Sequence, residues 1–113
     1  CNETGLPIIY SYNFHKDVGY RGRIVKHGLA MACDPQYPSN SAPSMGEMSA
    51  YGRRGWSSHT NHWLDVIMAV SYNSIIIEKH IKFLANDYEA GWSLYPNEFQ
   101  QMVKDIRWVE EAR

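Results

Sequence analysis

Strand-like runs alternate with helical patterns along the 113 residues of this chain, and that alternation limits the folds it can adopt. The strand-like runs are β-branched, aromatic or continuously apolar and follow turn residues. We expect strands over residues 7–13, 29–34, 55–59 and 74–80. Strands linked by crossover helices pair in parallel with right-handed connections, so the pattern indicates an α/β fold, either a doubly wound sheet or part of a (βα) barrel.

Two longer helices are predicted between and after these strands. Residues 61–72 follow Thr60, a residue type that caps helix N-termini, and residues 96–112 begin at Pro96, which is favoured in a first helical turn. The predicted apolar face of the first helix consists of Leu64, Ile67, Met68 and Ser71. That of the second consists of Phe99, Met102, Val103, Ile106 and Val109. Shorter helices are expected within 16–27 and 45–52.

The run over 74–80 is apolar and then becomes charged, Ser-Ile-Ile-Ile-Glu-Lys-His. This pattern is typical of a parallel strand that is buried on both faces. Alternation puts Glu78 and His80 on one side of the strand and Lys79 on the other. Glu78 can therefore support the histidine from beneath as a hydrogen-bonding carboxylate, or it can form an ion pair with Lys79 within the fold.

Composition narrows the classes of partner. Eleven Lys and Arg against twelve Asp and Glu give a net charge of -1, which excludes strong attraction to nucleic acid or to an anionic membrane. No apolar stretch approaches the roughly 20 residues that span a bilayer. We interpret the two cysteines, Cys1 and Cys33, as reduced thiols and expect a single domain over 1–113 with a cytoplasmic location.

Two histidines end consecutive predicted strands. His59 and His80 are one βα unit apart, and neighbouring strands lie about 4.8 Å apart, so both imidazoles can reach one metal ion. Alternatively, each is a packed histidine that is hydrogen-bonded to a backbone carbonyl. The chain contains no Gly-rich phosphate loop, nucleophile elbow or CxxC pair, which argues against hydride, kinase and thiol chemistry.

Several motifs resemble the second half of the sialic acid synthases, the N-acetylneuraminate synthase-like family. Gly-Trp-Ser-Ser-His-Thr at 55–60, Ile-Ile-Glu-Lys-His-Ile at 76–81 and Ser-Leu-Tyr-Pro-Asn-Glu-Phe at 93–99 are similar to three of its motifs. The family's usual forms are Gly-Tyr-Ser-Asp-His-Thr, Ile-Glu-Lys-His-Phe-Thr and Ser-Leu-Glu-Pro-Asp-Glu-Phe. Cys33 with Tyr37-Pro38 resembles its Cys-Thr-x-x-Tyr-Pro stretch, and residues 5–11 resemble its Gly-Lys-Pro-Val-Ile-Leu-Ser strand.

The resemblance implies a fold and a reaction. The family's catalytic domain is a (βα)8 TIM barrel, a transferase that condenses phosphoenolpyruvate with N-acetylmannosamine or a related sugar. This chain resembles its strands five to eight, a (βα)4 half-barrel. His59 and His80 would then ligate a divalent ion, manganese or magnesium, that polarises the sugar aldehyde. Tyr37, Ser57 and Glu89 correspond to substrate-binding positions, although packing, turn or solvated-loop roles also suit them; no catalytic residue is assigned.

Two departures from the family pattern bear on activity. Leu6 replaces a lysine that would help bind the phosphate of phosphoenolpyruvate, and Ser58 replaces an aspartate. Both changes weaken the case for ordinary substrate binding. We expect the chain alone to be inactive, because the resemblance places part of the groups that hold the two substrates on the first four strands of the barrel. Its expected partner is a second copy of itself in a homodimer or a complementary N-terminal half-barrel. The alternative is a noncatalytic half-barrel module that binds a sugar or a partner without turnover.

Overall fold

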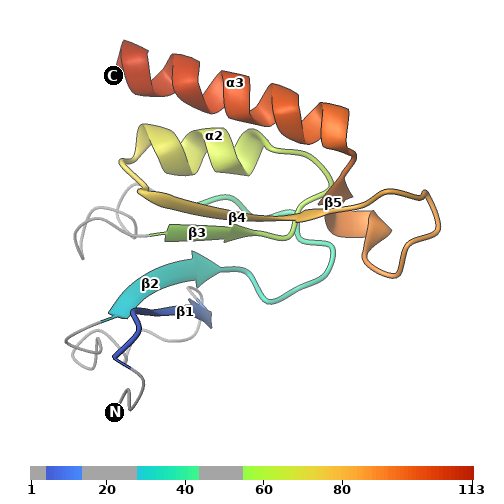
Figure 1. Cartoon of the computed structure of the whole chain (residues 1–113), viewed down its shortest axis with the longest axis horizontal. Helices are drawn as coiled ribbons and strands as arrows, with labels where there is room; N and C mark the ends of the chain where they lie inside the picture. The colour runs from blue at the N-terminus through green and yellow to red at the C-terminus, as the bar shows by residue number, and fades with distance from the viewer. Residues whose placement is uncertain (1–4, 14–27, 44–54) are drawn as a thin grey trace.

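The fold is a five-stranded parallel sheet with helices on one side. The computed structural model describes residues 5–13, 28–43 and 55–113 (Figure 1). The strands are β1 (Ile8–Asn13), β2 (Gly28–Cys33), β3 (Gly55–Ser58), β4 (Ile76–Ile81) and β5 (Ser93–Leu94). They lie in the order β1-β2-β3-β4-β5, and each pairs in parallel with the next. A doubly wound sheet reverses its strand order and a barrel wall does not, so the order favours half of a (βα) barrel.

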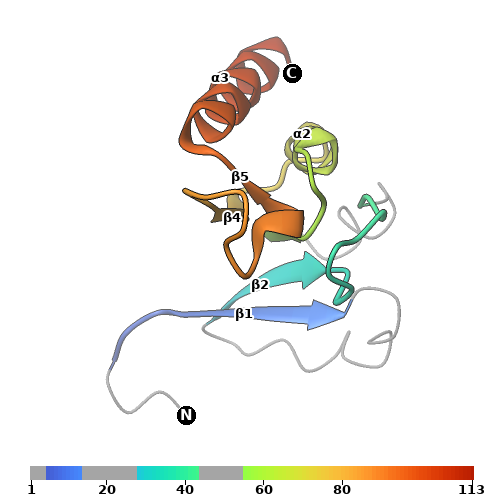
Figure 2. The same cartoon turned by 90° about the vertical axis from the view of Figure 1, so that its right-hand side faces the viewer.

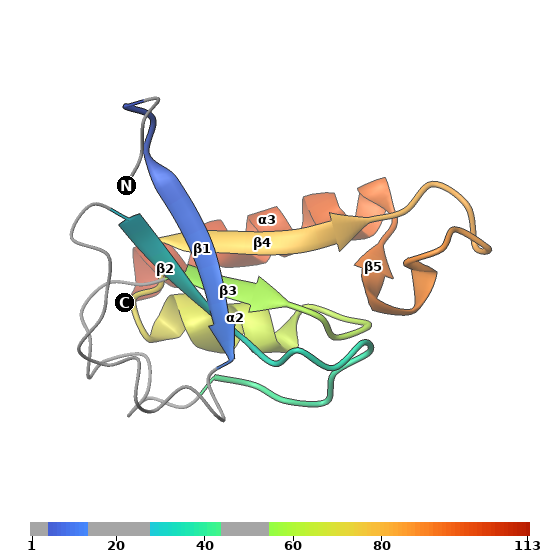
Figure 3. The ribbon, with the colours of Figure 1, turned by 90° about the horizontal axis from the view of Figure 1, so that it is seen from below.

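Two helices cover part of this sheet. α2 (Leu64–Ser71) connects β3 to β4, and α3 (Pro96–Ala112) follows β5, preceded by the short 3-10 helix η2 (Ala90–Trp92). Figures 1 and 2 show both helices over β3 to β5 on the same side, while β1 and β2 extend away from them. The view in Figure 3 shows the strongly twisted sheet that a barrel wall requires. No helix in the described segments is long and apolar enough to cross a membrane.

The predicted strands match the observed ones to within about two residues. α3 was predicted over the same residues, whereas the helices expected within 16–27 and 45–52, and Cys1, lie outside the described residues. β5 was not predicted. It contributes only two pairings, His80 with Ser93 and Ile81 with Leu94, and two residues are too few for a periodic signal.

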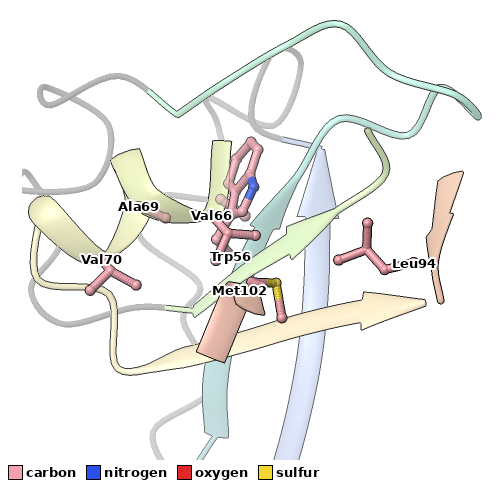
Figure 4. Close-up of a cluster of buried hydrophobic side chains, with 7 residues drawn as sticks. Trp56, Val66, Ala69, Val70, Leu94 and Met102 are labelled. Atoms are coloured by element: carbon pink, nitrogen blue, oxygen red, sulfur yellow. The ribbon is translucent and has the colours of Figure 1, made fainter. Parts of the chain in front are cut away.

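A buried cluster fills the space between the sheet and the helices (Figure 4). Its members come from β2, β3, β5 and both helices: Ala32, Trp56, Val66, Ala69, Val70, Leu94 and Met102. Trp56 is the largest, and its indole N–H donates to Asp65 Oδ2 at 2.8 Å. Because a buried indole N–H needs an acceptor, this bond fixes α2 against β3 as well as completing the core.

The predicted apolar face of α2 is wrong. Leu64 is 66% exposed and Met68 is 38% exposed, whereas the helix buries the opposite face. The buried residues are Asp65, Val66, Ala69 and Val70. In so short a helix both faces carry apolar residues, and the buried face combines Val66, Ala69 and Val70 with Asp65, whose carboxylate is hydrogen-bonded. Thr60 is not the N-cap either, since the helix begins at Leu64 and its N-cap residue, Trp63, makes no side-chain cap.

Two further predictions concerned the burial of β4 and of the apolar stripe of α3. β4 is not buried on both faces: its residues are half-buried or exposed, and Ile81 is 47% exposed. The helices cover only one of its faces, and β5 pairs with only its last two residues. The predicted stripe of α3 is confirmed at Met102, which is buried, and at Phe99, Ile106 and Val109, which pack partly buried against the core; Val103 is 37% exposed.

Candidate metal and substrate site

The carboxyl ends of β2, β3 and β4 place polar side chains on the uncovered face of the sheet. Cys33, Ser57 and Glu78 are in register across these three strands. The neighbouring positions Trp56 and Ile77 point to the helix side, so alternation directs Ser57 and Glu78 to the opposite face. Figure 1 shows the strands ending on one side of the molecule, where a (βα) barrel carries its chemistry.

His59 follows β3 and is held in one orientation. It is buried, and its Nδ1 lies 2.6 Å from the backbone oxygen of Asp34. A carbonyl oxygen only accepts, so Nδ1 carries the hydrogen and, in the neutral ring, Nε2 carries the lone pair. Burial lowers the pKa of His59, although the hydrogen bond to Asp34 opposes that shift. The imidazole is therefore neutral near pH 7, as a metal ligand must be.

His80 is also held through its Nδ1, in this case by the side chain of Glu89. Its Nδ1 lies 2.7 Å from Glu89 Oε2. Because the carboxylate only accepts, Nδ1–H donates to Glu89 and Nε2 is left with the lone pair when the ring is neutral. A carboxylate in this position fixes the tautomer of a metal-binding histidine. Glu89, predicted to contact substrate, thus lies against His80.

The two rings are close enough to share an ion. Their centroids are 5.6 Å apart. A metal–nitrogen bond of about 2.1 Å puts each centroid about 3.2 Å from the ion, so the limit for two rings is roughly 6.4 Å. Within the described residues, no group of three or more His, Cys, Asp or Glu side chains gathers for a metal ion. A shared ion would therefore take its remaining ligands from water and substrate oxygens, which hard divalent ions accept.

Ser57 links His59 to Glu78. Ser57 Oγ lies 2.6 Å from Glu78 Oε1 and 3.2 Å from His59 Nε2. Its single hydroxyl hydrogen goes to the carboxylate, so no hydrogen remains for the contact with the neutral Nε2. That lone pair is available to a cation. The predicted support of His80 by Glu78 is wrong, because Ser57 is its partner, and Glu78 and Lys79 form no ion pair because they point to opposite faces.

Aromatic rings form one side of this cluster. The Tyr37 ring lies 4.1 Å from that of His59 and 5.2 Å from that of Trp92, centroid to centroid. Tyr37 is 52% exposed, so part of its ring is open to solvent. The partial burial of Tyr37 and the nearby Cys33, Glu78 and Glu89 raise the pKa of its hydroxyl, which stays protonated. The sequence analysis missed Trp92, whose only signal was its place next to the Ser-Leu motif.

Lys79 points away from the histidines, toward the helices. Its Nζ contacts the backbone oxygen of Thr60 at 2.5 Å and Ser58 Oγ at 2.9 Å. Burial lowers the pKa of Lys79 to about 8, and the charge of Asp65 opposes this shift. The sequence analysis also missed Asp65, which is an unusual residue type for the buried face of a helix.

Taken together, the strand order and the site define the class of protein: half of a (βα) barrel with a pair of candidate metal-binding histidines at the carboxyl ends of its strands. The chain belongs to the NeuB family, whose profile matches residues 25–113. This confirms the resemblance to the sialic acid synthases. Members of the family use a divalent metal ion.

Two solved structures share the fold. The N-acetylneuraminic acid (sialic acid) synthetase of Leptospira borgpetersenii, solved with citrate, superposes with a TM-score of 0.78 at 19% identity over 96% of this chain. A putative spore coat polysaccharide biosynthesis protein E of Chromobacterium violaceum superposes with a TM-score of 0.65 at 19% identity over 91%. The matched part is 43% of the first chain and 35% of the second, so this chain spans less than half of either. No curated protein matches significantly.

Proposed function

We propose that this chain is the metal-binding half of a NeuB-family synthase that condenses phosphoenolpyruvate with N-acetylmannosamine or a related sugar. The observation that supports this most is the matched pair of histidines. Each uses Nδ1 for a fixed acceptor, and the rings lie within reach of one ion. In the reaction a carbon–carbon bond forms between C3 of phosphoenolpyruvate and the sugar aldehyde, water is added, and phosphate leaves.

Each residue of the site has a proposed role in binding the metal ion or the substrates. His59 and His80 would hold Mn²⁺ or Mg²⁺, which supplies Lewis-acid polarisation of the aldehyde oxygen when bound. Glu89 and the Asp34 carbonyl orient the two rings. Ser57, whose own hydrogen goes to Glu78, would accept from a substrate hydroxyl, and the exposed ring of Tyr37 would pack against the sugar.

The remaining groups of such a site would come from a partner that completes the barrel. Ile9 and Leu29 are paired across β1 and β2 and are 53% and 38% exposed. An exposed strand at the edge of a sheet can pair with further strands, and exposed apolar side chains on it can then be buried by them. The Leptospira chain, which is more than twice as long as the part matched here, supports a complementary N-terminal half-barrel as that partner. A second copy of this chain is the other candidate.

A fusion tests the proposal. The first four strands of a NeuB-family barrel are joined ahead of this chain, and product is measured with phosphoenolpyruvate, N-acetylmannosamine and Mn²⁺. We expect the fusion to form the acidic sugar and phosphate, and neither half alone to do so, because two substrates must be oriented together. His80→Ala in the fusion is the control and should abolish turnover.

Two results would contradict the proposal. A fusion that shows no cooperative unfolding transition would refute the complementary half-barrel. A folded fusion that binds Mn²⁺ but forms no product would favour the noncatalytic module. The exposed Leu6, where the family's lysine would help bind phosphate, is the observation behind that alternative.

A further inference from the structure

A second polar cluster lies behind the histidines, on the helix side of the sheet. It consists of Ser58, Thr60, Asp65 and Lys79. Ser58, Thr60 and Asp65 are each no more than 2% exposed. Buried polar groups destabilise a fold unless they are hydrogen-bonded, and buried charges unless they are also paired, so these contacts need an explanation.

The cluster contains one cation and one anion that meet through a hydroxyl. Lys79 Nζ lies 3.4 Å from Thr60 Oγ1, and Thr60 Oγ1 lies 2.8 Å from Asp65 Oδ1. The other carboxylate oxygen of Asp65 accepts from the Trp56 indole. Asp65 is thus the nearby counter-charge of Lys79, although the two do not touch.

These contacts hold the residues on both sides of His59. Lys79 binds Ser58 by its hydroxyl and Thr60 by its backbone oxygen. The backbone oxygen of His59 itself accepts from the amide of Ser39 at 2.8 Å. The segment that presents the imidazole is therefore fixed from the helix side, because alternation sends the neighbours of His59 there.

We propose that Asp65 and Lys79 are positioning residues for His59, and that Asp65 supplies from α2 the carboxylate that the usual Ser-Asp-His-Thr motif carries at position 58. With Ser58 in that place, the groups that Lys79 contacts among the described residues are neutral, and Asp65 restores the charge balance across Thr60. The functional meaning of the proposal rests on the ligand role proposed for His59.

Moving the carboxylate back tests this inference. Asp65→Asn removes the charge, and the double variant Ser58→Asp/Asp65→Asn returns it to the position next to Lys79. The first readout is the ¹⁵N spectrum of the His59 ring in the metal-free protein, which reports its tautomer. The second is the dissociation constant for Mn²⁺. Met102→Ala, a core change away from the cluster, is the control for loss of stability alone.

We expect Asp65→Asn to reduce the Nδ1–H form of His59 and to weaken Mn²⁺ binding by about tenfold, the usual size of an effect of an outer partner on a metal ligand. The double variant should recover both, and Lys79→Arg should keep both. Should Asp65→Asn fail to fold, recovery of fold and tautomer in the double variant still decides the matter. An unchanged tautomer in Asp65→Asn, or an equal change in Met102→Ala, would overturn the inference.

The two readouts separate this inference from the proposed function. If the parent chain binds no Mn²⁺ while the tautomer responds as expected, the ligand role of His59 fails and the positioning role stands. If Mn²⁺ binds and the tautomer of His59 does not change when the charge is moved, the positioning role is refuted and the ligand role of His59 is not.

Discussion

The two faces of β3 and β4 differ in what covers them and in the side chains they carry. On one face Trp56 and Ile77 pack under α2 and α3 in a closed core. On the other, Ser57 and Glu78 stand beside two histidines, and Glu78 and Tyr37 are exposed. Neighbouring residues of the same strands thus serve stability on one side and binding on the other, because side chains alternate across a sheet.

This difference separates what the chain does alone from what it needs a partner to do. The closed face has its tryptophan hydrogen-bonded and its small residues packed against helix. The open face has two oriented imidazole rings, and in the described part of the chain no third His, Cys, Asp or Glu side chain gathers with them. Substitutions should therefore affect folding on one face, and assembly or ion binding on the other.

The largest expected effect is on the closed face. Trp56→Ala removes the largest core side chain and the partner of Asp65, and should lower the free energy of unfolding by about 3–5 kcal/mol. Ile9→Ala, at a side chain that is 53% exposed on the open face, is the control and should cost the separated chain less than about 1 kcal/mol. Urea denaturation measures both. Equal losses would show that the two faces are not different in kind.

The next effect concerns assembly. We expect the parent chain to be a dimer at micromolar concentration that buries above about 2,000 Å². Ile9→Asp/Leu29→Asp puts charge on its open face and should weaken association by about a hundredfold, with little change in the unfolding of the separated chain. Light scattering across a dilution series provides the measurement. A parent that stays monomeric at micromolar concentration would refute the homodimer.

A smaller effect is expected at the carboxylate that orients His80. Glu89→Gln leaves a hydrogen-bonding group but removes the charge beside Nδ1, and should weaken Mn²⁺ binding by about tenfold. Because Glu89 is half-exposed, its removal should leave thermal stability nearly unchanged. If the melting temperature falls and Mn²⁺ affinity does not, Glu89 is a structural residue.

The smallest effect lies in the loop between β4 and η2. The amides of Phe83 and Leu84 donate to the Asp87 carboxylate and lower its pKa below 3.8. The stabilisation is present above that pH and is lost as pH falls from 3.8 through the lower folded-state value. The melting temperature of Asp87→Asn should therefore be about one degree below that of the parent at pH 7. In strong acid the two melting temperatures should be equal. A gap that stays constant with pH would contradict this linkage.

Elements with a clear hydrophobic pattern, and residues within a specific motif, could be predicted from the sequence. The parallel strands and α3 followed from periodicity, and the convergence of His59 and His80 followed from their places at consecutive strand ends. The buried face of α2 could not be predicted, because Val66, Ala69 and Val70 form a second apolar face that competes with Leu64 and Met68, and a buried aspartate hides it in the sequence pattern. The partners of Glu78 and Lys79 depend on contacts between strands, which no local pattern encodes.

Calorimetric titration with Mn²⁺ tests the central claim, that the open face holds one ion between two imidazoles. We expect one event per chain with an affinity between micromolar and millimolar, because two neutral ligands bind weakly. It should be absent from His59→Ala and from His80→Ala. His62→Ala should retain it, since His62 is an exposed histidine that accepts from the Leu64 amide outside the site. Binding of Mn²⁺ by the double variant His59→Ala/His80→Ala as strong as that of the parent would contradict the claim.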